Sequence, residues 1–370
     1  MKPRAQQPRA EQSRAEQKAR DIGEIEGPLQ GYHREWYVVR AEGPLASLGR
    51  VKVGEPRDAV LWFDRRCFAS EEELVGALAE LGMPHLPPLL RLEPDGPPFL
   101  GYIEGKTLAE LSPRGNDVAP ELLGQIIAVF RSLARVRTGD LPVERTCSLG
   151  DRAAEGDTGA FLHSLLRFTL NRVYRARHPV FGRLFDRLGV TGKALEPEAE
   201  LGAAASRLTG RPFCLLHGDL HRANFIVDAE RRLWTIDWEL AMLGDPLYDL
   251  ATHLHLMRYP ERQEKDVIEL WKRAVDETLP GATEGYAEDL PRYLAYKRVQ
   301  SVFTDVVRQA IAVRDARPEE LPQQLGVTAK TVHHVLERAA GPLGLDAVPA
   351  PGAVEDVYAE WAATSGARFP

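Results

Sequence analysis

The stretch that most constrains this chain is Leu216–Asp237, which has the sequence LHGDLHRANFIVDAERRLWTID. Two runs of β-branched and aromatic residues, Phe225–Val227 and Leu233–Ile236, flank a polar run, and this pattern predicts a tight β-hairpin. The hairpin would return Asp237 to the neighbourhood of Asn224, which directly precedes its first strand. The chain is therefore expected to hold a carboxylate and an amide close together.

The polar residues of this stretch indicate one kind of chemistry. Carboxylate and amide oxygens are ligands that Mg²⁺ accepts in proteins, and Asp237 and Asn224 would supply them. Asp219 would remain free to act on a hydroxyl group. Phosphoryl transfer from ATP needs this set, because it requires a positioned base and ligands that hold Mg²⁺ against the phosphates. A surface hairpin with chance acidic residues is the alternative, but several polar types recur here at fixed offsets.

The same stretch and the residues after it resemble a known family. His217-Gly218-Asp219, Asn224, Ile236-Asp237-Trp238-Glu239 and Gly244–Ala251 are similar to the motifs of the aminoglycoside phosphotransferase/choline kinase-like family. The resemblance is strong over residues 213–251 and weaker over the rest of residues 30–310. It implies an α+β chain with a bilobal protein-kinase-like fold, in which a small β-rich N-lobe precedes a larger helical C-lobe.

The resemblance also implies roles for individual residues. Asp219 would be the catalytic base, Asn224 and Asp237 would bind the metal, and Asp245 would brace the C-lobe. Arg222 departs from the family pattern, since many members have proline at this position. Because Arg222 lies beside the base, we expect it to contact phosphate or substrate.

The chain divides into a tail and two lobes on this interpretation. Residues 2–20 form a loose five-residue repeat almost without large apolar side chains, and such a segment cannot bury enough surface to offset its ordering entropy. We expect a disordered tail over residues 1–25, a nucleotide-binding N-lobe over 26–101 and a catalytic and acceptor-binding C-lobe over 102–370. A hinge at residues 100–106 would join the lobes.

Three strand-like segments are found in the predicted N-lobe: Trp36–Arg40, Arg50–Val53 and Ala59–Phe63. Ser47, between two glycines that separate the first two segments, is a candidate for the loop that covers the ATP phosphates. Kinases carry a phosphate-gripping lysine on their third strand. Here Trp62 occupies that place, which departs from the family pattern.

The missing cation must then come from a neighbouring position. Lys52 on the preceding strand, or Arg65 or Arg66 just beyond Trp62, would supply it, although ordinary surface cations would look the same. We take Lys52 and Arg66 as the leading candidates for the nucleotide phosphates.

A helix is predicted to begin at Ser70, because Ser70 and Glu73 have the spacing of a capping box. In a kinase this helix supplies a glutamate that pairs with the phosphate-gripping cation, so Glu72 or Glu73 is the candidate. Capping alone also explains these acidic residues.

The segment Pro98–Leu108 reads as a strand that stops at glycines and gives way to a helix. It resembles the family's hinge, where the backbone of Leu100 to Tyr102 would hydrogen-bond the base of ATP or GTP. A plain linker between lobes would have a similar sequence.

After the hinge the chain is predicted to be mainly helical. Apolar residues of 118–133 share one helix face, and a second helix is expected around Phe161–Tyr174, within an insertion at 145–200 near the acceptor site. Glu319–Arg338 resembles a helix-turn-helix with Gly326 at the turn. Two packed helices joined by a glycine turn would give the same sequence.

Side chains after Ala251 are candidates for the acceptor pocket. We assign His253 and Arg258 to it, together with Arg222 and Glu239 from the motif. Cations are at least as frequent as acids on these helices; the others are His255, Lys297, Arg298 and Arg308. Because unpaired like charges in a closed pocket cost several kcal/mol, a neutral or anionic acceptor fits this set better than a polycation.

Composition limits the partners of the chain. A net charge of −7 argues against a general nucleic-acid binder, whose footprint is usually basic. The three cysteines form no C-x-x-C pair, so neither a zinc site nor a disulfide frame is predicted. No apolar run has the length of a membrane span, and the N-terminus lacks a signal-peptide core, so we expect a cytoplasmic protein without a membrane partner.

We therefore expect a phosphotransferase that moves the γ-phosphate of ATP or GTP, with Mg²⁺, to a hydroxyl of a small molecule. The motif most resembles those of antibiotic kinases, and the Arg-, Ala-, Gly- and Leu-rich composition is typical of the GC-rich genomes of antibiotic producers. The expected acceptor is an antibiotic, nucleoside-type or aminoglycoside-like, modified for self-resistance. The alternatives are a kinase of a sugar or amino alcohol, and a pseudokinase scaffold or regulator that lacks the third-strand lysine.

Overall fold

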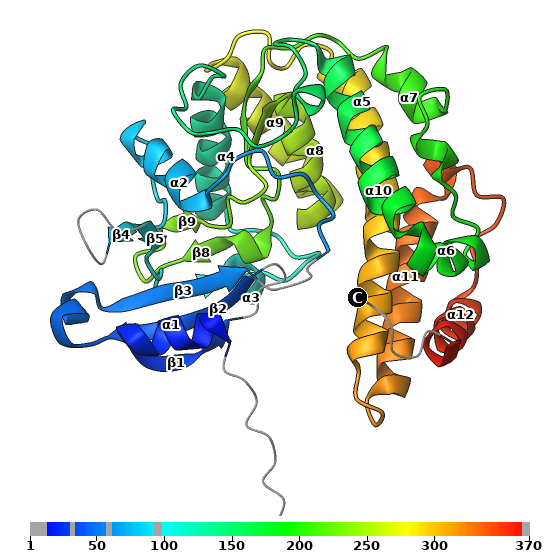
Figure 1. Cartoon of the computed structure of the whole chain (residues 1–370). Helices are drawn as coiled ribbons and strands as arrows, with labels where there is room; N and C mark the ends of the chain where they lie inside the picture. The colour runs from blue at the N-terminus through cyan, green and yellow to red at the C-terminus, as the bar shows by residue number, and fades with distance from the viewer. Residues whose placement is uncertain (1–12, 30–33, 57–60, 92–97, 365–370) are drawn as a thin grey trace, which may run out of the picture.

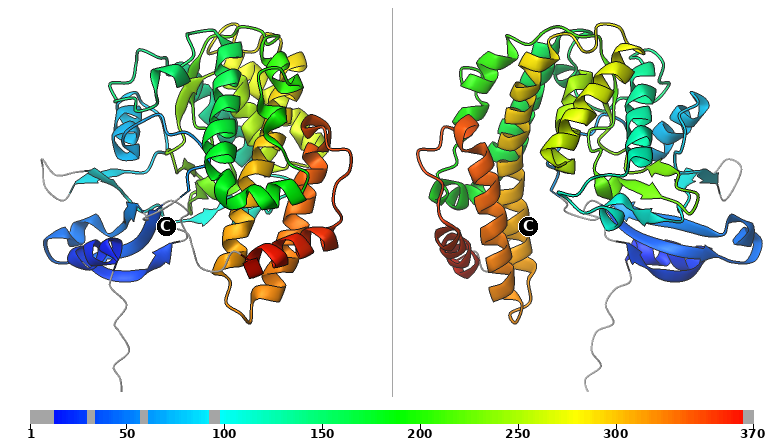
Figure 2. Two further views of the ribbon diagram at one scale, coloured as in Figure 1. Left: turned by 45° about the vertical axis from the view of Figure 1, so that its right-hand side comes forward. Right: turned by 180° about the vertical axis from the view of Figure 1, so that it is seen from behind.

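The computed structural model describes residues 13–29, 34–56, 61–91 and 98–364. The chain folds into two lobes of unequal size (Figure 1). The small N-terminal lobe is built on β-strands, and the larger lobe is mainly helical, with its longest helices standing apart from the small lobe's sheet (Figure 2). The α+β fold class predicted from the sequence is confirmed.

A three-stranded antiparallel sheet in the order β1-β2-β3 forms the centre of the small lobe. Its elements are α1 (Arg14–Ile22), β1 (Gly23–Leu29), β2 (Arg34–Ala41) and β3 (Arg50–Pro56). The helix packs on the sheet, and the two share an apolar core that contains Ala19, Ile22, Val39, Val51 and Val53.

The disordered tail expected over residues 1–25 is wrong for the part that the structure describes, because residues 14–25 belong to α1 and β1. Ser13 caps α1 by accepting a hydrogen bond from the Glu16 backbone N–H at 3.1 Å. Ala15, Ala19 and Ile22 recur on one helix face and are buried. Small alanine side chains let this helix approach the sheet closely, so few large apolar residues are needed. Residues 1–12 lie outside the described residues.

The strand β1 changes the strand count of the small lobe. The first two strands predicted from sequence are β2 and β3, while residues 61–63 of the predicted strand Ala59–Phe63 form no strand. Residues 59 and 60 lie outside the described part of the chain. Lys52 therefore stands on the third strand of the sheet, and the assignment of Trp62 to the position of the kinase lysine is wrong.

Helix α2 (Glu71–Glu80) begins where the sequence predicts. The Ser70 hydroxyl accepts a hydrogen bond from the Glu73 backbone N–H at 3.1 Å, which caps the helix. Leu74 and Leu78 point into the core shared with the larger lobe. The helix is thereby fixed beside the boundary between the lobes.

The segment between the lobes follows the predicted order of strand, glycine and helix. A two-stranded ladder, β4 (Leu89–Arg91) and β5 (Pro98–Leu100), ends at Gly101. Gly101 also bridges to β3, which ties this segment to the sheet of the small lobe. The chain then enters β6 (Lys106–Thr107) and α3 (Leu108–Leu111).

Helices form most of the larger lobe: α4 (Pro120–Arg135), α5 (Thr158–Phe168), α6 (His178–Arg187), α7 (Glu200–Ala205), α8 (Pro246–Met257), α9 (Glu261–Asp276), α10 (Tyr286–Asp315), α11 (Leu321–Leu343) and α12 (Pro351–Thr364). The helix predicted around residues 161–174 is present, as α5 continued by a π-helical turn. The helix predicted near residues 118–133 is α4. Among the described residues, no helix combines the length and apolar composition needed to cross a lipid bilayer.

Short strands in the larger lobe carry the motif residues. They are β7 (Cys214–Leu216), β8 (Phe225–Val227), β9 (Leu233–Thr235) and β10 (Met242–Gly244). β7 pairs with β10, while β8 lies between β6 and β9. The antiparallel pair β8–β9 is the hairpin predicted from the sequence.

Glu319–Arg338 does not form a helix-turn-helix. Most of this segment belongs to α11, which runs through Gly326 without a turn and packs along α10 (Figure 1). Glycine inside a helix costs only about 1 kcal/mol relative to alanine, and burial of the apolar face of α11 offsets this cost. Both sequence interpretations, a helix-turn-helix and two helices joined at Gly326, are wrong.

A buried ionic network fixes the start of α8. Asp245 caps this helix by accepting a hydrogen bond from the Leu247 N–H at 3.0 Å. Arg211 donates three hydrogen bonds to the same carboxylate at 2.7–3.2 Å and also reaches Asp289. The Tyr293 hydroxyl donates a further bond at 2.7 Å. Asp245 thus braces the larger lobe, as the resemblance implies.

Candidate active site

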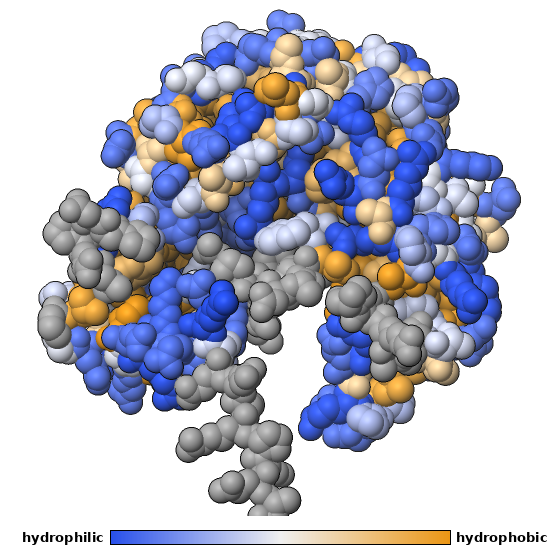
Figure 3. Space-filling model, in the orientation of Figure 1, coloured by the Kyte–Doolittle hydropathy of each residue, from blue (hydrophilic) through white to orange (hydrophobic). Residues whose placement is uncertain are grey.

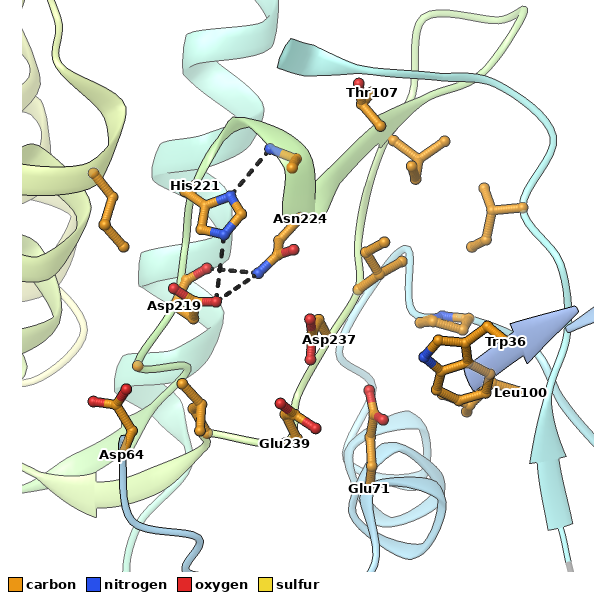
Figure 4. A pocket seen from close by; sticks show the side chains of 18 of the residues that line it. Trp36, Asp64, Glu71, Leu100, Thr107, Asp219, His221, Asn224, Asp237 and Glu239 are labelled. Carbon is orange, nitrogen blue, oxygen red and sulfur yellow. Dashed lines mark hydrogen bonds and ion pairs between the residues drawn. The ribbon is translucent and has the colours of Figure 1, made fainter. Parts of the chain in front are cut away.

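A cavity of about 910 Å³ lies between the two lobes. The space-filling view shows the molecule hollowed between the small lobe and the α10–α11 pair (Figure 3). Among the carboxylates that line the cavity, four from three segments lie near one another in the close-up (Figure 4); they are Glu71, Asp219, Asp237 and Glu239.

The loop that carries Asp219 is fixed by buried hydrogen bonds. The backbone N–H groups of His217 and Gly218 donate to the Asp249 carboxylate at 3.1 and 2.8 Å. Gly218 has a φ of 81°, and a Cβ at this position would lie 2.6 Å from the Leu240 carbonyl oxygen. Only glycine fits such a site without displacing the backbone. The residue after it, Asp219, is therefore held in a defined position.

Asp219 lies between two polar neighbours. The Asn224 Nδ2 donates to the Asp219 carbonyl oxygen at 2.9 Å and to its Oδ2 at 3.1 Å. His221 Nε2 lies 3.4 Å from the same Oδ2, while its Nδ1 accepts from the Ala223 N–H at 3.1 Å (Figure 4). Burial would raise the pKa of Asp219, but the hydrogen bond and charge of His221 and the charge of Lys297 outweigh it, and this pKa lies below its ordinary value. The carboxylate is therefore ionised at neutral pH.

The hairpin brings Asp237 to this loop. Phe225 pairs with Thr235 at the open end of the hairpin, and the Ile236 N–H donates to the Asn224 carbonyl oxygen at 3.0 Å. Asp237 follows with a φ of 66°, a left-handed conformation that costs energy outside glycine. The predicted return of Asp237 to the neighbourhood of Asn224 is present.

The surroundings of Asp237 fit a divalent cation. Burial and the neighbouring carboxylates of Glu71, Glu239 and Asp219 raise the pKa of Asp237 well above its ordinary value. A cation would offset this repulsion, and Asn224 adds an amide oxygen of the kind that Mg²⁺ binds. Within the described part of the chain, no three His, Cys, Asp or Glu side chains form a complete metal site. Further ligands would have to come from water or a bound molecule.

The small lobe adds a cation and an acid to the cavity. Lys52 reaches it from β3, and Glu71 reaches it from the first turn of α2. The Glu71 carboxylate also accepts a hydrogen bond from the Trp238 backbone N–H at 2.9 Å. The predicted glutamates, Glu72 and Glu73, do not line the cavity. The acidic residue of this helix that lines the cavity is one position earlier than predicted.

Three other predicted nucleotide contacts lie elsewhere. Ser47 belongs to a 3₁₀ turn (Gly43–Leu48) between β2 and β3 and does not line the cavity. Arg65 is buried and donates to the Ser164 hydroxyl at 2.8 Å, so it supports the larger lobe. Arg66 is bonded to Glu239 but does not itself line the cavity. Because β1 was missed, the phosphate loop was placed between β2 and β3, and the third strand was placed at residues 59–63, next to Arg65 and Arg66.

The opposite end of the cavity is apolar. Leu100 and Tyr102 from the hinge segment line this end, and Trp36 and Ile236 also contribute to the lining. The Lys52 ammonium lies 3.8 Å from the centroid of the Trp36 ring, at the border with the charged region. The cavity thus combines an apolar slot for a flat ring with a polar floor.

Arg222 points away from the cavity, which corrects its assignment to substrate or phosphate. Its guanidinium is buried and donates to the Ser112 carbonyl and hydroxyl oxygens at 2.6 and 2.7 Å. It also donates to the carbonyl oxygens of Met257 at 3.0 Å and Asn116 at 2.8 Å. Arg222 therefore ties the loop of residues 217–224, called the motif loop from here on, to α8 and to the segment after α3.

Replacing Arg222 with Met should destabilise the fold by roughly 3 kcal/mol, because it leaves several buried carbonyl oxygens without donors. Urea denaturation measures this change, with the exposed Arg262→Met variant of α9 as control, which should stay within about 0.5 kcal/mol of the parent. If Arg222 were a substrate contact, stability would be retained and only the KM for the acceptor would rise.

The other predicted acceptor residues lie in different surroundings. His253 is fully buried, with ring nitrogens 2.9 Å from the Leu220 carbonyl oxygen and 3.0 Å from the Tyr259 hydroxyl. Burial lowers the pKa of His253 to about 3, so it is a neutral support of the motif loop, and its assignment to the pocket wall is wrong. Glu239 lines the main cavity, whereas Arg258 lines a smaller one beside it.

Sequence reasoning misses several residues that line the cavity, among them Trp36, Asp64, Glu71 and His221. His221 is two residues from Asp219, so its proximity was readable from the sequence. Asp64 accepts a hydrogen bond from Gln300 of α10 at 2.6 Å, a contact that no local pattern indicates.

Comparisons with known proteins identify the family of this chain. The model of the phosphotransferase enzyme family (APH) matches residues 50–296. Similar solved structures include a choline/ethanolamine kinase family protein from Mesorhizobium loti, at 15% identity over 91% of this chain and 92% of that chain with a TM-score of 0.46. A macrolide 2'-phosphotransferase from Brachybacterium faecium is similar at 16% identity over 90% of this chain and 99% of that chain, with a TM-score of 0.46.

A spectinomycin phosphotransferase solved with ADP and spectinomycin is similar at 11% identity, over 92% of each chain, with a TM-score of 0.44. No curated protein matches the sequence significantly. The family match spans the strand of Lys52, the hinge segment, the motif loop and the hairpin. The chain belongs to the phosphotransferase enzyme family, with its bilobal kinase-like fold, and is a small-molecule kinase.

Proposed function

We propose that this enzyme transfers the γ-phosphate of ATP or GTP to a hydroxyl of a small molecule, with Mg²⁺ as cofactor. The observation that carries the proposal is the arrangement at the cavity floor. An ionised Asp219 lies beside Asn224, and Asp237 is crowded by further carboxylates. A base thus lies next to a carboxylate whose ionised form the surrounding acids disfavour and a cation would stabilise, as phosphoryl transfer requires.

In the proposed reaction the acceptor hydroxyl oxygen forms a bond to the γ-phosphorus, while the bond from that phosphorus to the bridging oxygen of the nucleoside diphosphate breaks. The hydroxyl proton passes to Asp219, which first orients the hydroxyl by accepting its hydrogen bond. Asn224 and Asp237 would hold Mg²⁺, which when bound offsets the charge of the donor phosphates. His221 holds the Asp219 carboxylate in its position.

The nucleotide would lie along the cavity from the hinge to the motif loop. The base fits the apolar end, between Trp36 and Leu100, where the backbone near Tyr102 offers hydrogen bonds. Lys52 would contact the phosphates from β3, with Glu71 as the nearby acid. In this proposal Lys52 serves as the lysine that the sequence analysis took as missing, and the main argument for a pseudokinase then no longer applies.

Replacing Lys52 with Met should lower kcat/KM for ATP about 10- to 100-fold, because a hydrogen bond to a charged group contributes about 1.5–3 kcal/mol. Steady-state kinetics and AMP-PNP titration measure the effect. Lys18→Met is the matched control, since Lys18 forms an exposed ion pair with Glu55 in the same lobe. Equal activity of both variants would mean that another residue binds the phosphates.

We propose an antibiotic, or a related secondary metabolite, as the acceptor, with phosphorylation serving self-resistance. The cations beside the cavity suit a nucleoside-type or otherwise non-polycationic compound better than an aminoglycoside. A sugar or amino alcohol of primary metabolism is the alternative. All three cysteines are free and buried, which suits a reducing compartment, and we propose the cytoplasm.

Incubation with Mg-ATP or Mg-GTP and a panel of hydroxylated antibiotics and metabolites tests the proposal. Mass spectrometry should detect one added phosphate on an acceptor, and chromatography should detect equal formation of nucleoside diphosphate. Expression in a sensitive host then separates the two acceptor classes. Protection against a non-polycationic drug supports self-resistance, and protection against kanamycin-like drugs alone would refute the ranking.

A further inference from the structure

A second cavity of about 460 Å³ lies beside the first, between the end of α8, α10 and α11. The two cavities share lining residues, among them Arg114, His255, Ser301 and Arg308. A ligand whose hydroxyl lies at Asp219 can therefore extend into the second cavity. This geometry makes the second cavity part of the space available to the acceptor.

The lining of this second cavity is strongly basic, and we refer to it as the basic cavity. Its cations are Arg114, Arg258, Arg298, Arg308, Lys330 and Arg338. They come from four separate segments, and Lys330 and Arg338 share one face of α11 with His334 because their spacing is that of successive helical turns. Among the described residues that line it, Asp305 is the only acid.

Asp305, and Glu264 beside the cavity, offset only part of these charges. Arg258 lies 2.9 Å from the Nε2 of His334, whose pKa is lowered by burial and by the nearby arginines, so this partner is neutral. The buried Nε of Arg298 has no hydrogen-bond partner within the described residues. Burial and the charges of Arg258 and Arg298 also lower the pKa of Arg338. Like charges are thus held together at a cost that a bound anion would offset.

We infer that the basic cavity binds an anionic group of the phosphate class on the acceptor, so that the acceptor is itself a phosphorylated hydroxyl compound. The inference rests on the proposed function, because it places the reacting hydroxyl at Asp219. Guanidinium groups match the oxygens of a phosphate in paired hydrogen bonds. Six cations against one acid suit a dianion better than a single carboxylate, and they exclude a polycationic acceptor.

The first test uses inorganic phosphate as probe and enzyme saturated with Mg-AMP-PNP, which fills the donor phosphate positions. Calorimetry should detect phosphate binding that weakens at least tenfold in Arg298→Gln/Arg338→Gln. The exposed Arg273→Gln of α9, which lines neither cavity, should bind phosphate as the parent does. Sulfate should compete with phosphate, whereas acetate at the same concentration should not.

The double variant should keep or raise its melting temperature, since it removes two mutually repelling charges. Equal phosphate affinity in the parent and the double variant, or no phosphate binding by the parent, would overturn the inference. Stronger competition by acetate than by sulfate would overturn the phosphate class. If the double variant loses phosphate binding because it is unfolded, Arg298→Lys/Arg338→Lys takes its place. This variant keeps the charge and should lose less affinity for phosphate.

A second test uses matched acceptors, namely nucleosides and sugars with their monophosphates. The phosphorylated member of a productive pair should have at least tenfold higher kcat/KM than its partner, and this ratio should fall toward one in the double variant. A parent enzyme that prefers the unphosphorylated member refutes the inference and leaves the kinase activity intact. If AMP-PNP does not bind in a Mg²⁺-dependent manner, the proposed function fails. Phosphate affinity of the parent and of the double variant, both without nucleotide, then tests the anion site by the same tenfold difference.

Discussion

Replacing Asp219 with Asn should lower kcat by roughly 10²–10⁴ and leave the fold and nucleotide binding unchanged. The amide cannot accept the hydroxyl proton, and it orients the hydroxyl less well. Its oxygen can still accept the hydrogen bond that Asn224 donates to the carboxylate. The loop is also held from outside Asp219, through the bonds of His217 and Gly218 to Asp249.

Two measurements separate loss of chemistry from loss of structure. Initial rates with an acceptor from the panel give kcat, and calorimetric titration gives the affinity for Mg-AMP-PNP. The exposed Asp266→Asn variant of α9 is the control for the change of charge and should retain full activity. Turnover of Asp219→Asn close to that of the parent would contradict the assignment of the base.

The motif region was predictable because its geometry is local. Asn224, Asp237 and the strands between them belong to one hairpin, whose pairing follows from the alternation of a few side chains. The bond between the Ile236 N–H and the Asn224 carbonyl closes the hairpin, so sequence separation translated directly into distance. Gly218 has a positive φ, a backbone conformation that glycine adopts readily.

The small lobe was harder to predict, because its first strand has a weak local signal. β1 has the sequence GEIEGPL, in which glycines, glutamates and a proline all disfavour strands. It forms because β2 provides a partner and α1 covers the sheet. Because this strand was missed, Lys52 was counted on the second strand instead of the third, and Trp62 was given the place of the kinase lysine.

The orientation of polar side chains near the motif could not be predicted from the sequence either. Arg222 lies beside the base in sequence, yet its donors meet carbonyl oxygens that are supplied by the segment of Ser112 and by the end of α8. His253 lies on α8, and its Nδ1 is within hydrogen-bonding distance of the Leu220 carbonyl oxygen. Both contacts depend on how distant segments pack, which no spacing in the sequence specifies.

The largest effect is expected at Asp237. Asp237→Asn should lower activity by about 10³-fold or more, since metal stabilisation of a phosphoryl-transfer transition state is worth several kcal/mol. Asparagine is the sharper substitution, because it tolerates the left-handed backbone at this position. Asp237→Ala should lose activity to the same degree and also some stability, because alanine is strained at a positive φ.

The stability of Asp237→Asn should move in the opposite direction from its activity. In the parent without cation, burial and the carboxylates of Glu71, Glu239 and Asp219 oppose ionisation of Asp237. A neutral amide removes that repulsion, so the melting temperature of the cation-free variant should equal or exceed that of the parent. The parent should gain stability from Mg²⁺ with AMP-PNP, and the variant should not.

A matched change at Asn224 separates the two proposed ligands. Asn224 is a neutral ligand, so Asn224→Ala should weaken Mg²⁺ binding less than loss of the Asp237 carboxylate, and excess Mg²⁺ should restore part of its activity. The same excess should not restore Asp237→Asn. Unchanged Mg²⁺ dependence in both variants would mean that the cation binds elsewhere, and the crowding of Glu71, Asp237 and Glu239 would then need another partner to offset it.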